Sequence, residues 1–396
     1  MAQYSILNSW RCLYTRRNRC RHTFRAPTNL RREELALTLQ TRLAYSLAWS
    51  AVQRELMKLK AIILALLSLS ICGRASAQEQ GQPRPAEAPP TDTVAKDIPG
   101  VIGGGTKIQV VIASVPGHGT PGVAVQGTEG PIALPDGTMV FCETILGRVA
   151  KVDKDGKESV FVDANIANGP NGLAWDSKGR LIGATTAPGH MGVQAIYPKG
   201  SEAVLADKFE GKPFVRPNDL FADKKGGVYF TDPANVPNPP MPPAVYYIAP
   251  GGGTVSKVAD GIEFPNGVTM SLDQKVLYVN DTGGEYILAF DVQKDGTLRN
   301  RRNFGKYEDL TITGGKVGGG GDGFTVDTKG RIYAAAGGSV QVFSPQGQLL
   351  GKIPTSRRPQ NLTFAGPDMK TLYVVGGGAV FKVQMVAQGI KSRGGK

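Results

Sequence analysis

The sequence predicts an all-β protein, a six-bladed β-propeller with four-stranded blades. Three observations carry this prediction: 52 glycines among 396 residues, a pattern that recurs six times, and one unassigned strand ahead of the first copy. Abundant glycine is typical of many short strands joined by tight turns. Hydrophobic residues make up 41% and charged residues 20% of the chain, which excludes both a disordered protein and a multi-span membrane protein.

Each copy of the repeat begins with an oxygen-bearing side chain, followed by a short apolar strand, a polar turn and a second apolar strand. The copies begin at Glu129, Asn171, Asn218, Asn266, Asp322 and Gln360. They follow one another at intervals of 42, 47, 48, 56 and 38 residues. This regular recurrence favours a repeat fold over a sandwich of unrelated hairpins.

Two further strands complete each copy. Third strands are expected at residues 148–152, 193–197, 244–248, 286–290, 339–343 and 379–383. Fourth strands are expected in the first five copies, at residues 159–162, 202–205, 254–258, 297–304 and 349–353. The sixth copy has little chain left, so we expect residues 107–113 to supply its fourth strand and to close the ring. Closure removes the exposed edges of the sheets.

Most of the net charge of +13 lies ahead of the repeats. Residues 1–56 hold ten arginines and three acidic residues, and we expect a mis-started or disordered basic extension there. Residues 57–77 have a basic start, a short apolar run and an Ala-Ser-Ala end, which is typical of a signal peptide cleaved after Ala77. We therefore expect an exported protein, periplasmic or secreted. A transit peptide or nucleic-acid arm at 1–56 and a lipid anchor at Cys72 are the alternatives.

The rest of the chain divides into three parts. Residues 78–105 are rich in Pro, Gln, Glu and Ala and are predicted to form a disordered linker. The propeller is expected over residues 106–390 and a disordered tail over 391–396. Residues 78–396 carry 33 basic and 30 acidic residues, so their charge gives no reason to expect a nucleic-acid partner. We expect no stable membrane span, and a monomer or weak oligomer.

The six residues that begin the repeats are expected to converge at one end of the central channel, because the first strand of each blade lies nearest the axis. All six carry oxygen donors, which favours calcium as the bound cation and keeps Mg²⁺, Mn²⁺ and Zn²⁺ open. Glu129 and Asp322 carry the prediction best, because two carboxylates in a low-dielectric channel repel each other unless a cation separates them. The alternative is that these residues bond local backbone, as turn residues do. Cys142 is expected to be a buried apolar side chain rather than a nucleophile.

Short motifs along the repeats resemble the senescence-marker-protein/gluconolactonase/luciferin-regenerating-enzyme family, which includes regucalcin and bacterial gluconolactonases. They are TEGP at 128–131, RPNDL at 216–220, YFTDP at 229–233, FPNGV at 264–268 and GDG at 321–323. The resemblance implies one divalent cation on the axis of a six-bladed propeller, with Glu129, Asn266 and Asp322 as its ligands. It also implies that Arg216 and Asn218 bind substrate and that Asp322 donates or accepts a proton. Asn171 and Gln360 are additional axial candidates.

The implied activity is that of a metal-dependent hydrolase that opens a lactone, as gluconolactonase does, with a small lactone or sugar-acid lactone as its partner. Some family members have a substrate-binding glutamate after the third-blade asparagine, but residues 234–243 contain no acid here, so the sequence leaves the lactone open. One alternative is a non-catalytic exported propeller that binds a small ligand or partner and holds a structural cation. Another is hydrolysis of phosphotriesters or aryl esters on the same metal.

Overall fold

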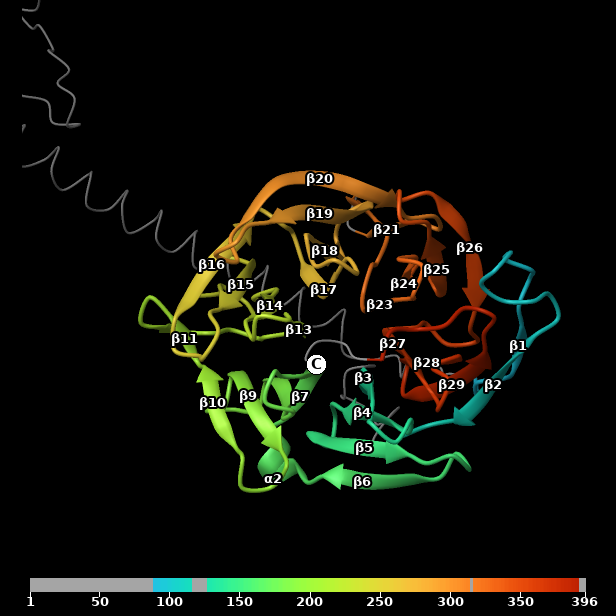
Figure 1. The fold of residues 1–396 in the computed structure, drawn as a ribbon, viewed down its shortest axis with the longest axis horizontal. Coiled ribbons are helices and arrows are strands. Elements are labelled where there is room, and N and C mark those ends of the chain that lie inside the picture. The colour runs from blue at the N-terminus through green and yellow to red at the C-terminus, as the bar shows by residue number, and fades with distance from the viewer. Residues whose placement is uncertain (1–87, 116–126, 314–315, 392–396) are drawn as a thin grey trace, which may run out of the picture. The chain divides into compact units, whose positions relative to one another are not determined.

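The computed structural model describes residues 88–115, 127–313 and 316–391, which form a ring of antiparallel sheets (Figure 1). Six of these sheets are blades, five with four strands and one with five, and this confirms the predicted six-bladed β-propeller. The predicted basic extension and signal peptide lie outside the described residues, as do the first part of the predicted linker and the tail from residue 392.

The first three blades follow the chain in order. Blade 1 contains β3 (Thr128–Ala133), β4 (Met139–Glu143), β5 (Arg148–Val152) and β6 (Glu158–Val162). Blade 2 contains β7 (Pro170–Trp175), β8 (Leu181–Thr185), β9 (Gly192–Tyr197) and β10 (Ala203–Ala206). Blade 3 contains β13 (Leu220–Ala222), β14 (Val228–Asp232), β15 (Ala244–Ile248) and β16 (Val255–Asp260).

The last three blades repeat this order from the axis outwards. Blade 4 contains β17 (Pro265–Met270), β18 (Val276–Asp281), β19 (Tyr286–Val292) and β20 (Leu298–Lys306). Blade 5 contains β23 (Phe324–Val326), β24 (Ile332–Ala336), β25 (Ser339–Phe343) and β26 (Leu349–Pro354). Blade 6 contains β27 (Asn361–Ala365), β28 (Thr371–Gly376) and β29 (Ala379–Gln384), and it is completed from the N-terminal side of the repeats.

Strand β2 (Lys107–Ile112) closes the ring. It pairs with β29 in antiparallel register, with Gln109 opposite Lys382 and Val110 opposite Phe381. The prediction that the segment ahead of the first repeat supplies the missing strand of blade 6 is therefore confirmed. A short strand, β1 (Thr93–Val94), pairs with the other side of β2 and makes this sheet five-stranded.

The linker prediction is wrong for residues 88–105. In addition to β1, this stretch buries Ala95, Ile98, Val101 and Ile102, which pack in one hydrophobic cluster with blades 5 and 6. The predicted linker as a whole, residues 78–105, is rich in Pro, Gln, Glu and Ala, and this average conceals a few well-spaced aliphatic side chains near its end. Burial of those side chains offsets the entropy lost when the segment is ordered.

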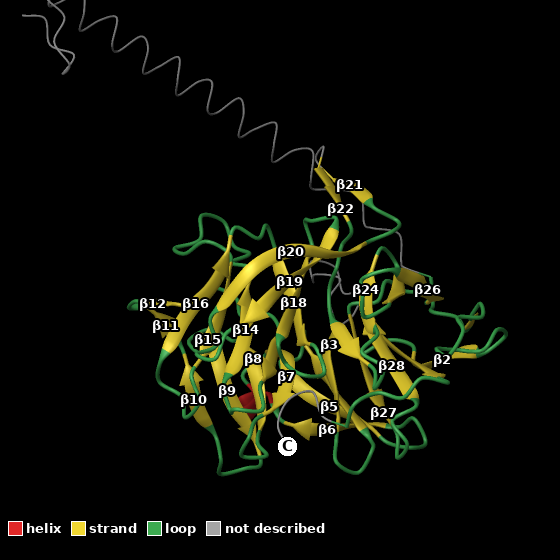
Figure 2. Ribbon diagram, turned by 45° about the horizontal axis from the view of Figure 1, so that its top comes forward, coloured by secondary structure: helices red, strands yellow, loops and turns green. Residues whose placement is uncertain are grey.

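The repeats vary in spacing because the connections between blades vary. Helix α2 (Ala164–Ala167) lies between blades 1 and 2, and the hairpin of β11 (Lys208–Phe209) and β12 (Lys212–Pro213) lies between blades 2 and 3. The longest spacing contains the hairpin of β21 (Thr311–Thr313) and β22 (Lys316–Gly318), which Figure 2 shows standing clear of the blades. Within the described ranges, no helix is long and apolar enough to cross a membrane.

The C-terminal segment lies at the end of the channel where the inner strands finish. The Thr328 N–H donates to the Gln388 carbonyl at 2.8 Å, and the Gly389 N–H donates to the Met369 carbonyl at 2.8 Å. Ile390 lines a small space on the axis together with Ile132 of β3. The inner strands therefore begin at the opposite end of the channel, and the connections between blades enter there.

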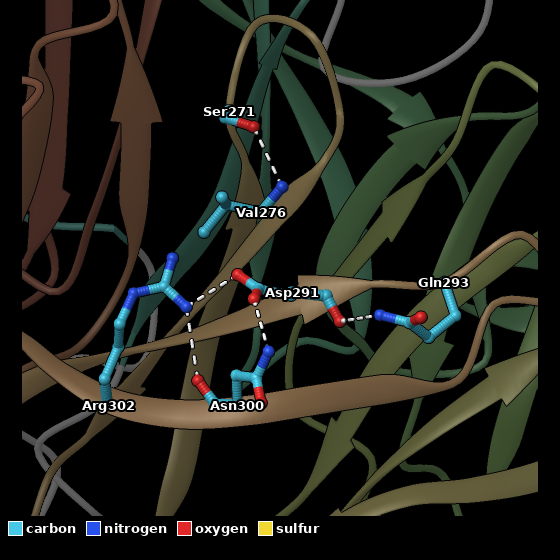
Figure 3. A network of polar contacts seen from close by, with 6 residues as sticks. All are labelled: Ser271, Val276, Asp291, Gln293, Asn300 and Arg302. Carbon is cyan, nitrogen blue, oxygen red and sulfur yellow. Dashed lines mark hydrogen bonds and ion pairs between the residues drawn. The ribbon is translucent and has the colours of Figure 1, made fainter.

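Arg302 of strand β20 lies on the outer edge of blade 4 (Figure 3). Arg302 Nη1 lies 2.7 Å from Asp291 Oδ1, and the Asn300 amide donates to Asp291 Oδ2 at 2.8 Å. The Arg302 and Asp291 side chains are 44% and 38% exposed, so this is a solvated surface pair of small energetic value.

Candidate functional site

The residues that begin the six repeats all lie where the innermost strand of each blade begins, but they differ in burial. Glu129, Asn266, Asp322 and Gln360 are buried. Asn171 and Asn218 are half-buried. A carboxylate or amide buried on a propeller axis needs polar partners, and the contacts of each residue show which partners it has.

The Glu129 carboxylate joins blade 1 to blade 6. Gln360 Nε2 donates to Glu129 Oε1 at 3.2 Å, and Asn361 Nδ2 donates to Glu129 Oε2 at 3.2 Å. The Gln360 side-chain oxygen in turn accepts the Gly377 N–H at 3.0 Å. The Gln360 side-chain oxygen is therefore occupied by a backbone N–H, and its NH₂ group supports Glu129. Gln360 does not act as a separate oxygen donor.

Asn266 and Asp322 form the second contact between blades. Their side chains are hydrogen-bonded to each other. Asn266 Nδ2 also donates to Thr282 Oγ1 at 3.1 Å, and the Thr282 hydroxyl donates to the Gly321 carbonyl at 2.7 Å. The end of strand β18 thereby ties the blade 4 amide to the segment that carries Asp322.

A second buried pair supports the main chain at Asp322. The Tyr307 hydroxyl donates to Asn280 Oδ1, and Asn280 Nδ2 donates to the Asp322 carbonyl oxygen. Both Tyr307 and Asn280 are buried, and the repeat pattern did not point to either residue.

Glycines allow the inner strands to approach closely. In four repeats a glycine follows the axial residue, at Gly130, Gly172, Gly267 and Gly323. A Cβ atom on Gly267 would lie 2.2 Å from the Asp322 carbonyl oxygen, and one on Gly130 would lie 2.3 Å from the Asn171 carbonyl oxygen. Any side chain there would push neighbouring blades apart, so these glycines bring the axial residues within reach of one another.

Asp219 is a buried carboxylate that the sequence reasoning did not select. It is 1% exposed, and it stands at the position that glycine occupies in four other repeats. Its Oδ1 accepts the Leu220 N–H at 2.9 Å, and its Oδ2 accepts the Val268 N–H of blade 4 at 3.2 Å. The departure from glycine was the sequence signal that could have identified it.

Burial sets the electrostatics of this end of the axis. Desolvation is the largest cause that raises the pKa of Glu129 well above its usual range, and the charge of Asp322 adds to it. Desolvation also raises the pKa of Asp322 to about 7, while the charge of Arg358 opposes the shift and that of Asp219 adds to it. Negative charge is therefore concentrated here and is incompletely balanced by protein groups.

The donor set fits a hard divalent cation. It combines the carboxylates of Glu129 and Asp322 with the amide of Asn266, and all three side chains are buried. No group of three or more His, Cys, Asp and Glu in the described part of the chain is arranged to hold a metal ion, so the asparagine is needed to complete such a site. Carboxylate and amide oxygens are ligands typical of calcium.

The predicted substrate-binding residues lie at the entrance of blade 3. Arg216 is exposed, and its backbone N–H donates to Asp232 Oδ1 at 3.0 Å. The Asn171 side-chain amide donates to the Asn218 backbone carbonyl at 3.2 Å, so it bonds the backbone of the next blade rather than its own local backbone. Arg216 and Asn218 therefore lie on the same connection, and Asn171 supports it.

Cys142 is buried in strand β4 opposite Glu129, as expected for a structural side chain. Burial raises the pKa of its thiol well above the usual range, and the charge of Glu129 adds to the shift. A neutral, enclosed thiol is a poor nucleophile.

We expect Cys142→Ala to fold normally and to lose about 1 kcal/mol of unfolding free energy. In a chain that starts at Gln78, where Cys142 is the one remaining cysteine, a thiol reagent should react only after denaturant is added. Rapid labelling of the folded protein would contradict this view of the thiol.

Comparison with known proteins supports the family resemblance of the short motifs. The family model described as SMP-30/Gluconolactonase/LRE-like region matches residues 127–377. A gluconolactonase from Zymomonas mobilis is 27% identical over 288 residues, which cover 66% of this chain and 79% of that protein.

Solved structures include a gluconolactonase from Xanthomonas campestris with a TM-score of 0.61 and 28% identity, covering 75% of this chain and 95% of that one. A calcium-binding regucalcin from Agrobacterium tumefaciens has a TM-score of 0.56 at 20% identity, over 68% of this chain and 93% of that one, and shares the fold. The relatives with gluconolactonase and lactonase names support a lactone-hydrolysing function. With the match over most of the propeller, this chain belongs to the SMP-30/gluconolactonase/LRE-like family.

Proposed function

We propose that the protein is a metal-dependent hydrolase that opens a sugar-acid lactone, with calcium as its cation. The observation that carries the proposal is the burial of Glu129 and Asp322 at one end of the axis, where the charge of Asp322 raises the pKa of Glu129. Two such carboxylates beside the Asn266 amide suit a hard divalent cation. The lactonase names of the relatives support the reaction class.

Glu129, Asn266 and Asp322 would hold the cation. When bound, it supplies a positive charge that polarises the lactone carbonyl and offsets the negative charge developing on the carbonyl oxygen. Calcium suits the three oxygen donors, and magnesium, manganese and zinc are the alternatives for the test below.

The protein's own groups move the proton and orient the substrate. Asp322 accepts a proton from the attacking water, because it is a buried carboxylate at the proposed cation site and the family resemblance assigns it the proton transfer. The water oxygen bonds to the carbonyl carbon, the bond from that carbon to the ring oxygen breaks, and the ring oxygen takes a proton, which leaves a hydroxy acid. Arg216 and Asn218 donate hydrogen bonds to oxygens of the substrate.

Lactone opening can be followed by proton release in a weakly buffered solution. A panel of sugar and simple aliphatic lactones is offered to protein treated with chelator and then supplied with Ca²⁺, Mg²⁺, Mn²⁺ or Zn²⁺. We expect turnover that disappears with chelator and returns with calcium. A rise in melting temperature with calcium, without turnover of any lactone, would contradict the hydrolase and favour the non-catalytic binding protein.

The protonation of Asp322 predicts how pH affects stability and calcium binding. Its folded-state pKa is about 7 against an ordinary value of 3.8, so between these values the folded, metal-free protein holds a proton that the unfolded chain has released. The contribution of this group to the unfolding free energy therefore falls as pH rises from about 4 to 7. Because calcium binds the ionised form, its affinity should rise over the same range.

Thermal melts at pH 5, 6, 7 and 8, with chelator or with calcium, check this prediction. The gain in melting temperature on adding calcium should be larger at pH 8 than at pH 5. Asp322→Asn, which has no proton to exchange at this position, should reduce the pH dependence of the chelated protein, and Glu129, whose pKa burial also raises, accounts for the remainder. A calcium effect that is equal at both pH values would show that Asp322 does not titrate on binding.

We also propose that the protein is exported after cleavage behind Ala77. Protein purified from its natural source should then begin at Gln78. N-terminal sequencing checks this directly, and a mature protein that begins at Met1 would contradict it.

A further inference from the structure

Two of the six repeats share a motif just ahead of the axial residue. Arg216-Pro217 precedes the Asn218 position, and Arg358-Pro359 precedes the Gln360 position. The residue equivalent to the two arginines in the other repeats is Gly127, Gly169, Phe264 or Gly320. An arginine at this position is therefore a feature of blades 3 and 6 alone.

The backbone places the two motifs equivalently. The Asn218 N–H donates to the Thr231 carbonyl at 2.8 Å, and the Gln360 N–H donates to the Val375 carbonyl at 2.8 Å. Blades 3 and 6 are three blades apart in a ring of six, and Figure 1 shows β13 and β27 on opposite sides of the centre. The motifs thus face each other across the axis, at the end where the inner strands begin.

The Arg358 side chain contacts the connection that leads into blade 5 and carries Asp322. Its Nη2 donates to the Gly320 carbonyl at 3.4 Å, and Gly320 stands two residues before Asp322. The positive charge also acts on the Asp322 carboxyl, whose pKa it lowers. Its backbone is closely packed, because a Cβ atom on Gly376 would lie 2.3 Å from the Arg358 carbonyl oxygen.

Arg216 and Arg358 are both exposed. Among the described residues, neither of them forms an ion pair with a carboxylate. Several other arginines of the propeller do, as Arg302 does with Asp291 (Figure 3). A guanidinium has five N–H donors, and the long bond to Gly320 uses one of them. Arg358 therefore presents a charged donor group beside the axial site.

We propose that Arg358 binds a second, anionic group of the substrate, so that the preferred lactones carry a carboxylate or a phosphate away from the reacting carbonyl. This inference rests on the proposed lactone hydrolysis and deepens it by naming the substrate class. Arginine suits the role because its planar fork bonds carboxylate and phosphate oxygens in pairs. Across the axis, Arg216 remains for the oxygens at the reacting end, and residues 234–243 add no acidic side chain that would repel an anion.

Three lactones test the proposal on the full-length, calcium-loaded protein: neutral glucono-1,5-lactone, its 6-phosphate, and a glucaric acid lactone that carries a free carboxylate. The variants are R358Q, which removes the charge, and R358K, which keeps the charge without the fork. The matched control is R301Q, because Arg301 is also an exposed arginine that donates to a backbone carbonyl, at Gly261 O and 2.9 Å, but it belongs to the outer strand β20.

In the wild type we expect a higher kcat/KM for a charged lactone than for the neutral one. R358Q should lower the ratio of charged to neutral kcat/KM about 10- to 100-fold, mainly through KM, because a charge-assisted hydrogen bond is lost. R358K should restore part of the ratio, and R301Q should leave it unchanged. The phosphate and carboxylate lactones together tell which anion the site prefers.

An equal loss for charged and neutral lactones in R358Q would overturn the proposal, because Arg358 would then act only through Asp322 and its loop. An unchanged ratio would overturn it as well. If the wild type opens no lactone, the proposed function fails, and calorimetric titration with 6-phosphogluconate decides the anion site separately. Binding by the wild type that R358Q loses would support the site without hydrolysis, and no binding by the wild type would overturn it.

Discussion

Asp322→Asn should abolish calcium binding and lower lactone turnover about 100- to 1000-fold. The change removes one of two carboxylates expected to hold the cation and, with it, the group expected to accept the proton. Because Asp322 is buried and its ionised form is disfavoured, the chelated variant should be at least as stable as the chelated wild type. Calorimetric titration with calcium, proton-release assays and thermal melts measure the three effects.

The combination of lost function and retained stability separates a site residue from a structural one. Asp291→Asn is the control, since Asp291 is a half-exposed carboxylate of strand β19 that pairs with Arg302 of the outermost strand of blade 4 (Figure 3). It should bind calcium and turn over lactone like the wild type. If Asp322→Asn bound calcium with unchanged affinity, the axial site proposed here would be wrong.

The second large effect concerns closure of the ring. Ile108 is fully buried on β2, the strand that completes blade 6, so Ile108→Ala should lower the unfolding free energy by about 2–4 kcal/mol. Its neighbour Gln109 is exposed, and Gln109→Ala should stay within about 0.5 kcal/mol. Denaturant titration of both variants measures the difference.

A truncation tests the same closure more severely. A chain that begins at Ser114 lacks β1 and β2, which leaves the edge of β29 unpaired and uncovers the cluster around Phe381. We expect it to aggregate or to unfold well below the wild-type temperature. A chain that begins at Gln78 retains both strands and serves as the control, and equal melting temperatures for the two chains would contradict a structural role for β2.

The six-bladed fold was predictable because the same pattern recurs six times in the sequence and because one further strand, ahead of the first repeat, is available to close the ring. The sixth repeat lacks a fourth strand and residues 107–113 form a strand with no blade of its own, so the two are expected to pair. The pairing of β2 with β29 confirms this. Residues 88–105 were misjudged, because composition averages over a segment while burial depends on single residues such as Ile98 and Ile102. The hairpin of β21 and β22 was also missed, since it lies between repeats and follows no pattern.

For the candidate site, equivalence within the repeats predicted that Glu129, Asn266 and Asp322 lie together, and the structure brings them to one end of the axis. Their roles as metal ligands stay predictions. Equivalence did not predict Asp219, whose importance follows from a carboxylate standing where glycine is usual.

The sequence by itself determined the number of blades, the strand that closes the ring and the family, because these depend on a periodic pattern that local residues carry. Only the tertiary structure decided which axial side chains are engaged by backbone hydrogen bonds and which have a shifted pKa. The Gln360 oxygen is engaged by the Gly377 N–H, whereas Asp322 is buried with a pKa raised to about 7. Both residues occupy equivalent places in the repeat, and they differ because burial, partners and neighbouring charges arise from contacts between blades distant in the chain.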